Sequence, residues 1–524
     1  MKFCVRLTAL LLALCCVLGL AACSGKGGDR FRYDFPSRVV NMDPQFTTEQ
    51  EGKTILANCM EGLVRQRADG GIELAAAEKM ELSKDQKVYT FTLKEGLTWS
   101  DGTPLTSRDF AFGLRRMFDS GVASPYADEF ASLQNGRAVL EGKQSADALG
   151  IAAPDDRTLV LTLQEPDSFF EQALCTPAAL PCSEEFFRST RGRYGLGRKF
   201  LLYNGPFAIT GWSDDKLVLT RNDHYTDQVL PDQVTFYIGR KDAEQQLIDG
   251  KADAGVISPQ NLQKAVDKGL NYAAYDNAVW AVVFNQKTEL LANGDIRHAL
   301  QMAMDRDYVT GSLSRNCVPT AAVIPPTVTL EGSETYRQAA GEALEPVYTP
   351  DAGRTLYKKT LAALDKPEPT LTLLVPEGAD YVTCAGLVQQ QWQQNLSLYT
   401  NIQVLPQDQY TQKLGAGEYD IALVQLNPSE DSPEGVLGRF LSTSSENVAN
   451  YHSAQYDTLM NQLIEANSLD QVVELASQAE DQLINENVLV PLFLSTSYFG
   501  TGSSVRNVDY SPYSGRVLFR TATK

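Results

Sequence analysis

Three short stretches of the chain alternate apolar and polar residues with a period of two, at positions 89–93, 159–163 and 216–220. Such alternation predicts half-buried β-strands. Apolar residues recur at helical spacing in segments 295–305 and 471–485, which predicts helices whose apolar stripes pack into a core. Because strands and helices are mixed along the chain, the pattern indicates an α/β or α+β protein.

Proline and glycine residues mark two further segments. Ser258 and Pro259 form a helix start signal and Gly269 a stop signal, so we expect a helix between them. The stretch 324–353 carries several proline and glycine residues. This composition predicts a long surface connection on one lobe of the protein.

Length and charge limit the classes of protein to consider. The 524 residues exceed the ~150 of a typical domain, so we expect two or more packing units. With 43% apolar and 21% charged residues the chain can bury a core, which excludes a disordered protein. Its 46 basic residues against 65 acidic ones give a net charge of -19. A nucleic-acid partner is not expected, because phosphate binding needs basic patches.

The N-terminus reverses this charge and has the layout of an export signal. Lys2 and Arg6 precede an apolar run, residues 7–22, that is too short to span a bilayer comfortably. The run ends in small residues before Cys23 and the polar stretch 24–28. This order resembles the bacterial lipobox, in which the cysteine is acylated and the chain is cut just before it. We therefore expect residues 1–22 to be a removed signal peptide and Cys23 to carry a membrane anchor.

Five cysteines remain after such cleavage, and only Cys175 and Cys182 are close in sequence. They form either a disulfide or two reduced buried thiols. The chain has no C-x-x-C motif, and its three histidines are far apart, so we expect no metal site. It also lacks the motifs of serine hydrolases, zinc proteases, phosphate-binding loops and dinucleotide-binding folds. We expect neither catalytic residues nor a cofactor.

A strand, an Asp-Gly turn and a capped helix start follow one another in residues 89–110, with the landmarks Trp99, Asp101, Gly102, Pro104 and Asp109. This stretch resembles the signature of the family 5 bacterial extracellular solute-binding proteins. Further blocks similar to that family follow in its order, at positions 41–44, 124–127, 204–207, 217–222, 284–286, 295–300, 305–307, 419–422 and 490–492. The resemblance spans nearly the whole mature chain and is greatest to the oligopeptide-binding branch.

The resemblance implies a two-lobe α/β fold of the periplasmic-binding-protein type (type II, cluster C), with an extra domain inserted in the first lobe. The expected first lobe comprises residues 24–57, 183–278 and 489–524. The expected inserted domain is 58–182, and the expected second lobe is 279–488.

The family's function implies a binding protein rather than an enzyme. Members capture a solute between the lobes, close around it and deliver it to the permease of an ATP-binding-cassette importer, which has a cytoplasmic ATPase. For this chain we expect a peptide ligand whose backbone pairs with strand edges. We expect a monomer anchored by lipid to the outer face of the cell membrane, on the periplasmic side in a Gram-negative host.

Several ligand-contacting positions carry over from the resemblance. Thr48 and Gln50 match the cleft-lining stretch of the first lobe, and Tyr126 matches a contact from the inserted domain. Trp280 lies where relatives place aromatic residues at the lobe crossing; ordinary packing is the alternative for Tyr126 and Trp280. The expected ligand-pairing strand comprises Val424, Gln425, Leu426 and Asn427.

The chain departs from its relatives at Ser429, where they place the aspartate that pairs with the ammonium end of the peptide. A hydroxyl does not supply that charge-assisted hydrogen bond. In the first hypothesis, a small register shift lets Glu430 or Asp431 bind the ammonium group. In the second, the ligand has no free N-terminus, as in a blocked peptide, a glycoside or a metal chelate. A signalling peptide bound as the ligand is a further possibility within the same function. A surface lipoprotein hydrolase is a remoter alternative.

Overall fold

A computed structural model describes residues 29–524, except 68–70, 120, 122–123, 168, 315–316, 331–333, 366–368, 429–430 and 445. The predicted signal peptide, the lipidation site Cys23, and Ser429 and Glu430 therefore lie outside the described residues. Below, first lobe, inserted domain and second lobe denote the residue ranges predicted above.

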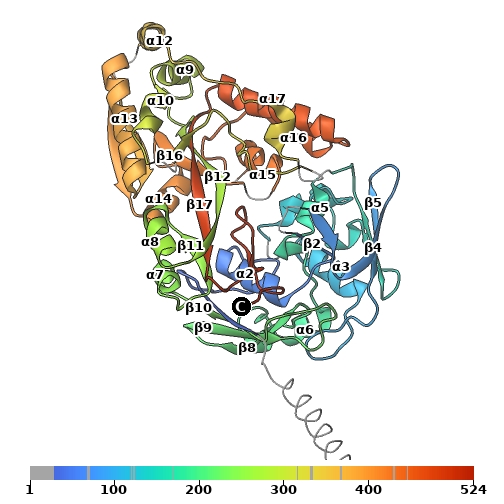
Figure 1. The fold of residues 1–524 in the computed structure, drawn as a ribbon. Helices are drawn as coiled ribbons and strands as arrows, with labels where there is room; N and C mark the ends of the chain where they lie inside the picture. The colour runs from blue at the N-terminus through green and yellow to red at the C-terminus, as the bar shows by residue number, and fades with distance from the viewer. Residues whose placement is uncertain are drawn as a thin grey trace, which may run out of the picture.

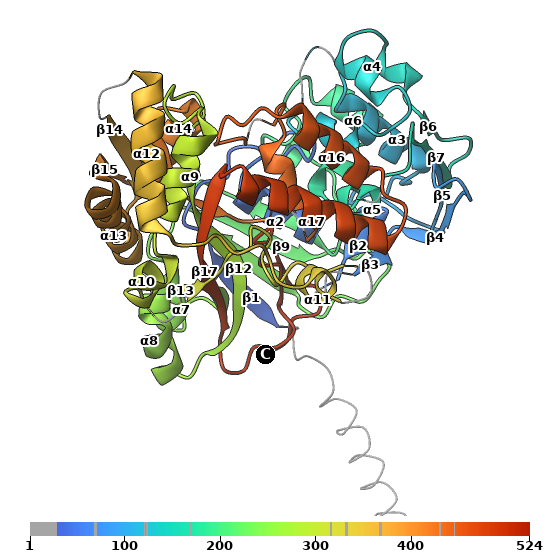
Figure 2. The same ribbon diagram turned by 90° about the horizontal axis from the view of Figure 1, so that it is seen from above.

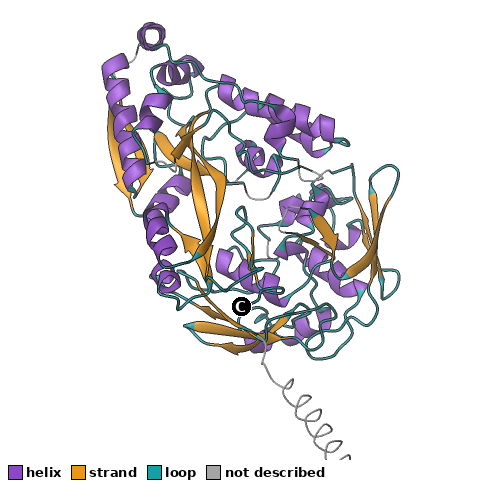
Figure 3. Cartoon of the chain, viewed as in Figure 1, coloured by secondary structure: helices purple, strands orange, loops and turns teal. Residues whose placement is uncertain are grey.

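A mixed sheet of eleven strands, counted over the described residues, runs through both lobes (Figures 1 and 3). In sheet order its strands are β15 (Tyr399–Leu405), β14 (Thr370–Pro376), β16 (Ile421–Leu426), β12 (Asn271–Phe284), β17 (Leu489–Thr501), β11 (Ala254–Ile257), β1 (Arg30–Asp34), β10 (Gln233–Tyr237), β9 (Lys216–Arg221) and β8 (Phe207–Trp212), with β13 (Cys317–Pro319) paired to β17.

The long strands β12 and β17 connect the two lobes (Figure 1). They pair antiparallel from Asn271 opposite Thr501 to Val283 opposite Leu489, with register shifts between Tyr275 and Ala278 and between Trp280 and Ala281. The predicted boundary at 278/279 therefore falls within β12, between these two irregularities.

Successive side chains of β12 point to opposite faces of the sheet, so alternate residues belong to different core clusters. Val279, Ala281 and Val283 pack into one hydrophobic cluster of the second lobe, and Trp280, Val282 and Phe284 into another. Since both faces of a strand are covered here, every residue from 278 to 284 is buried.

The inserted domain has a sheet of its own (Figure 1). Its order is β4 (Ala77–Leu82), β5 (Val88–Leu93), β7 (Thr158–Thr162) and β6 (Ile151–Ala152). Two hairpins complete the strands: β2 (Val64–Gln66) with β3 (Ile72–Leu74), and β18 (Asp509–Tyr510) with β19 (Val517–Leu518). One hydrophobic cluster includes residues of both the inserted domain and the first lobe, such as Phe91, Phe110, Phe31 and Phe519.

Helices cover these sheets, as Figure 2 shows from above. In the first lobe and inserted domain they are α2 (Gln50–Cys59), α3 (Ser107–Arg116), α4 (Gly136–Leu140), α5 (Phe170–Ala173), α6 (Glu184–Ser189), α7 (Ala243–Ile248) and α8 (Leu262–Asp267). In the second lobe they are α9 (Gly294–Met302), α10 (Arg306–Gly311), α11 (Tyr336–Ala340), α12 (Pro350–Leu364), α13 (Ala379–Leu396), α14 (Gln407–Ala416), α15 (Glu434–Leu437), α16 (Ala454–Ile464) and α17 (Leu469–Asn485). Among the described residues, no helix combines the length and apolar character needed to cross a bilayer.

The predicted secondary structure is confirmed where local patterns were clear. The three alternating stretches are β5, β7 and β9, and the helical stretches are α9 and α17. After Ser258 the chain first forms a short 3-10 turn, Pro259–Asn261, and then α8, which precedes Gly269 in the left-handed conformation (φ 78°). Thr106 and Asp109 form the capping box of α3.

The prediction that 324–353 is a surface connection was wrong for its first half. Ile324, Val328 and Tyr336 are buried in a core cluster, and Tyr336 begins α11. The cause is Glu480 of α17, whose carboxylate accepts hydrogen bonds from the backbone N–H groups of Val323 and Ile324. A buried partner for the backbone allows a proline-rich segment to enter the core.

Candidate functional site

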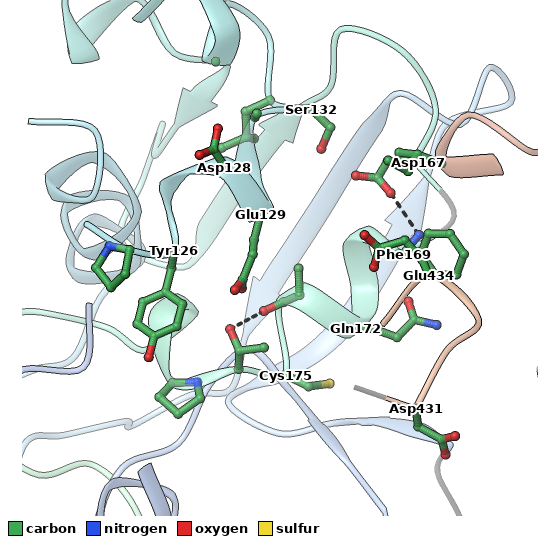
Figure 4. Close-up of a pocket in the computed structure, with 18 of the residues that line it drawn as sticks. Tyr126, Asp128, Glu129, Ser132, Asp167, Phe169, Gln172, Cys175, Asp431 and Glu434 are labelled. Carbon is green, nitrogen blue, oxygen red and sulfur yellow. Dashed lines mark hydrogen bonds between the residues drawn. The ribbon is translucent and has the colours of Figure 1, made fainter. Parts of the chain in front are cut away.

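A cavity of about 910 Å³ lies between the two lobes and the inserted domain. Its wall takes residues from both ends of the first lobe (Thr48 and Tyr513), from the inserted domain (Tyr126) and from the second lobe (Asp431). The volume is at the upper end of the roughly 300–1,000 Å³ usual for ligand sites. Figure 4 shows part of this wall.

The first-lobe wall is held in place by contacts with the inserted domain. Gln45 Nε2 donates to the carbonyl oxygens of Ala178 and Leu180, at 3.0 and 2.8 Å. The Ser124 hydroxyl donates to Gln45 O at 2.5 Å. These contacts fix the chain just before Thr48 and Gln50, both of which line the cavity.

Tyr126 joins the inserted domain to the same segment. It is 8% exposed, and its hydroxyl donates to the carbonyl oxygen of Thr47. The ammonium nitrogen of Lys53 lies 5.2 Å from the centroid of its ring, within cation–π range. Tyr126 therefore packs between the inserted domain and the first lobe and also contributes to the cavity wall.

Asp431 lines the cavity from the second lobe. Its carboxylate accepts hydrogen bonds from the backbone nitrogen of Thr329 at 2.7 Å and from the Thr329 hydroxyl at 2.5 Å. Burial raises the pKa of this carboxyl group. Nearby, the Tyr513 hydroxyl donates to Thr327 O, so the C-terminal segment of the first lobe contacts the second lobe beside Asp431.

The predicted ligand-pairing strand is β16, and its residues are not among those that line the cavity. Val424 and Leu426 point into a core cluster, whereas Gln425 and Asn427 are exposed. One edge of β16 pairs with β12 from Ile421 to Leu426. On the other edge, within the described residues, β14 pairs only with Ile421 and Ala422. Most of that edge is therefore not covered by β14.

Trp280 is also not among the residues that line the cavity. It is 3% exposed and stacks on Tyr381, with ring centroids 4.0 Å apart. Its indole nitrogen donates to the Ser495 hydroxyl at 3.1 Å. These contacts are those of a core residue and correspond to the packing alternative.

The cavity wall also contains charged residues that the sequence analysis did not single out. Glu129, next to Asp128 in the inserted domain, faces the cavity together with Asp167 (Figure 4). The pKa of Glu129 is raised to about 7, first by burial and then by the negative charges of Glu434 and Glu446, while Lys53 opposes this shift. Because these residues come from separate stretches of the chain, no local motif marks them.

The structure also shows the state of the cysteines and of the clustered acidic side chains in the described part of the chain. Cys175 and Cys182 form no disulfide with each other; Cys182 is a buried thiol, as the second alternative expected, whereas Cys175 is only partly buried. No group of three or more His, Cys, Asp or Glu side chains there is arranged to hold a metal ion.

The comparisons with known proteins agree with this architecture. A family model described as "Bacterial extracellular solute-binding proteins, family 5 Middle" matches residues 71–447. The chain is 27% identical to the dipeptide-binding protein DppE of Bacillus subtilis over 485 residues, which cover 90% of this chain and 88% of that protein. It is also 27% identical to the periplasmic oligopeptide-binding protein OppA of Salmonella typhimurium, over 87% of this chain and 85% of that protein.

Solved structures share the fold. The Listeria monocytogenes OppA bound to peptide superposes with a TM-score of 0.76 and 24% sequence identity, over 95% of this chain and 99% of that one. The two-lobe α/β fold expected from the sequence is thereby confirmed. Since the family model also covers most of the chain, this protein belongs to the family 5 bacterial extracellular solute-binding proteins.

Proposed function

We propose that the protein captures peptides in the interlobe cavity and delivers them to the permease of an ATP-binding-cassette importer. The observation that carries this proposal is the cavity of about 910 Å³ whose wall comes from both lobes and the inserted domain. Relatives over most of the chain are named as dipeptide- and oligopeptide-binding proteins, and one structure of the same fold is bound to peptide.

The fold suggests how capture works. The lobes are joined through β12 and β17, whose pairing is irregular between Tyr275 and Ala278. A change of backbone angles at such a point would open and close the cavity as a hinge. Closure around a peptide would exclude water and bring together surfaces of both lobes that a permease recognises.

We assign the ligand contacts to two sets of residues. Thr48, Gln50, Tyr126 and Asp431 line the cavity and would contact side chains or termini of the peptide. Val424, Gln425, Leu426 and Asn427 belong to or follow β16, most of whose second edge is not paired with β14. Extension of that edge by the peptide backbone gives affinity without reading side chains.

The ammonium group of a peptide needs an acidic partner where relatives have the aspartate that Ser429 replaces. Asp431 is supported by its place in the cavity wall. Its carboxylate retains acceptor capacity beyond its hydrogen bonds with Thr329 and Tyr513. Glu430 remains the alternative partner under the first hypothesis.

We propose a non-catalytic monomer whose acylated Cys23 holds it on the outer face of the cell membrane. Export followed by acylation agrees with the N-terminal pattern and with an extracellular family.

Mass spectrometry of the ligand released from natively purified protein tests the peptide assignment. We expect peptides of a few residues, released by denaturation and absent from a mock purification. Release of a glycoside, a metal chelate or an N-blocked peptide would contradict a ligand with a free N-terminus.

A further inference from the structure

The wall of the interlobe cavity carries a strong excess of negative charge. Among the described residues that line it, eight have carboxylates and three have basic groups. Such a lining raises the local concentration of cations and lowers that of anions. The negative charge of the lining therefore favours cationic peptides over anionic ones.

Carboxylates near the rim already have cationic partners. Glu165 accepts from Lys87 Nζ at 2.7 Å, and Glu446 accepts from Arg439 Nε at 2.7 Å. Glu129 differs, because within the described residues it forms no salt bridge. The charges that shift its pKa are those of Lys53, Glu434 and Glu446.

These groups come from opposite walls. Glu129 belongs to the inserted domain, whereas Glu434 and Glu446 belong to the second lobe, and all three face one cavity. Both second-lobe carboxylates raise the pKa of Glu129, because like charges that line the same cavity repel. Lys53, and Arg439 through its ion pair with Glu446, supply positive charge near these three carboxylates. A further cation between the walls would relieve this repulsion as the lobes close.

We propose that the cavity selects peptides carrying a lysine or arginine side chain, whose cation is held between Glu129 and the second-lobe carboxylates of Glu434 and Glu446. This inference rests on the proposed peptide-binding function and adds a preference for basic side chains to it. The ring of Tyr126 already has the Lys53 ammonium group 5.2 Å from its centroid. The same wall therefore already accommodates one cation beside an aromatic ring.

Calorimetric titration with three tripeptides tests the proposal: Ala-Lys-Ala, Ala-norleucine-Ala and Ala-Glu-Ala. They share free termini and similar length, so differences in affinity report the charge of the central side chain. We expect Ala-Lys-Ala to bind at least about tenfold more tightly than the norleucine peptide, as charge-assisted hydrogen bonds imply. Ala-Glu-Ala should bind more weakly than both.

The variant Glu129→Gln removes one charge from the cavity at nearly constant size. We expect it to reduce the preference for lysine over norleucine to about threefold or less. Glu81→Gln is the matched control, since Glu81 lies on β4 of the same domain, is exposed and is not among the residues that line the cavity. It should keep the wild-type preference.

The outcomes separate this inference from the proposed function. Equal affinity for all three peptides would overturn the charge preference and leave peptide binding intact. The same holds if Glu129→Gln retains the full preference. Absence of heat with every peptide would overturn peptide binding, and the charge preference with it.

Discussion

Arg116 of α3 and Asp43 of the first lobe form a bidentate ion pair, with Nη2 to Oδ2 at 2.6 Å and Nη1 to Oδ1 at 2.7 Å. Their side chains are 8% and 11% exposed. Arg116 also donates to Gln45 Oε1 at 2.6 Å. This pair ties the inserted domain to the stretch of chain that leads to Thr48, and thus fixes one wall of the cavity.

Replacing Arg116 with methionine leaves the Asp43 carboxylate buried without its partner. We expect the free energy of unfolding to fall by about 3–5 kcal/mol. Urea unfolding followed by circular dichroism measures the change. The exposed pair of Arg108 with Asp156, at 3.2 Å, gives the control. Arg108→Met should cost under about 1 kcal/mol, and equal losses in the two variants would contradict the structural role of Arg116.

Glu480 holds a proline-rich segment in the second-lobe core. It is 2% exposed, accepts two backbone hydrogen bonds and pairs with Arg337 at 2.8 Å. Glu480→Ala should therefore destabilise the protein by about 3–5 kcal/mol. Glu474, exposed on the same helix, is the control, and Glu474→Ala should change stability by under about 0.5 kcal/mol. If Glu480→Ala also changed the free energy of unfolding by under about 0.5 kcal/mol, the stabilising role of this buried network would be refuted.

The pKa of Glu129 predicts a pH dependence of stability. Folding raises it from an ordinary value of 4.5 to about 7, so the folded state binds this proton more tightly than the unfolded state does. The resulting stabilisation is complete below about pH 4.5 and is lost as the pH rises to about 7. Glutamine stays neutral, so Glu129→Gln should raise Tm above wild type at about pH 8 and match it near pH 4.

Thermal melting of both proteins between about pH 4 and pH 8 measures this difference. Glu81→Gln is again the control, because Glu81 is an exposed group outside the cavity wall. A difference in Tm between Glu129→Gln and wild type that does not change with pH would rule out titration of Glu129 in this range.

The N-terminal pattern predicts a lipid anchor at Cys23, outside the described residues. In Cys23→Ser the thiol that accepts the acyl chain is missing, so we expect the protein to move from the membrane fraction to the soluble fraction. Each buried methylene contributes ~0.8 kcal/mol to membrane binding, so the loss should be nearly complete. Immunoblots of fractionated cells measure it, with Ser24→Ala as the control. Unchanged membrane retention would exclude this anchor.

Local patterns in the sequence predicted elements of the fold that depend on local contacts. Alternation marked β5, β7 and β9, and the capping residues Thr106 and Asp109 marked the start of α3. The burial of Ile324 was not predictable in this way, because it depends on Glu480, 156 residues away. The proline and glycine content of a segment indicates that it forms turns. It does not indicate which distant residue packs over the segment and buries it.

Part of the candidate site could likewise be predicted from the sequence, and part could not. Motifs of the family led to Thr48, Gln50 and Tyr126, which line the cavity. The acidic wall was missed, since 65 acids along the chain give no sign of which ones converge. For Trp280 the sequence left a ligand contact and ordinary packing as alternatives; β12 is covered on both faces, which places the indole ring in a core cluster.

The central claim is that peptides bind in the interlobe cavity. Calorimetric titration of the purified protein with a mixed pool of tri- to hexapeptides tests it most directly, with Tyr126→Ala as the variant that removes part of the wall. The account predicts saturable heat with one site per chain, and much weaker binding in the variant. Absence of heat across the pool would contradict it, as would wild-type affinity in Tyr126→Ala.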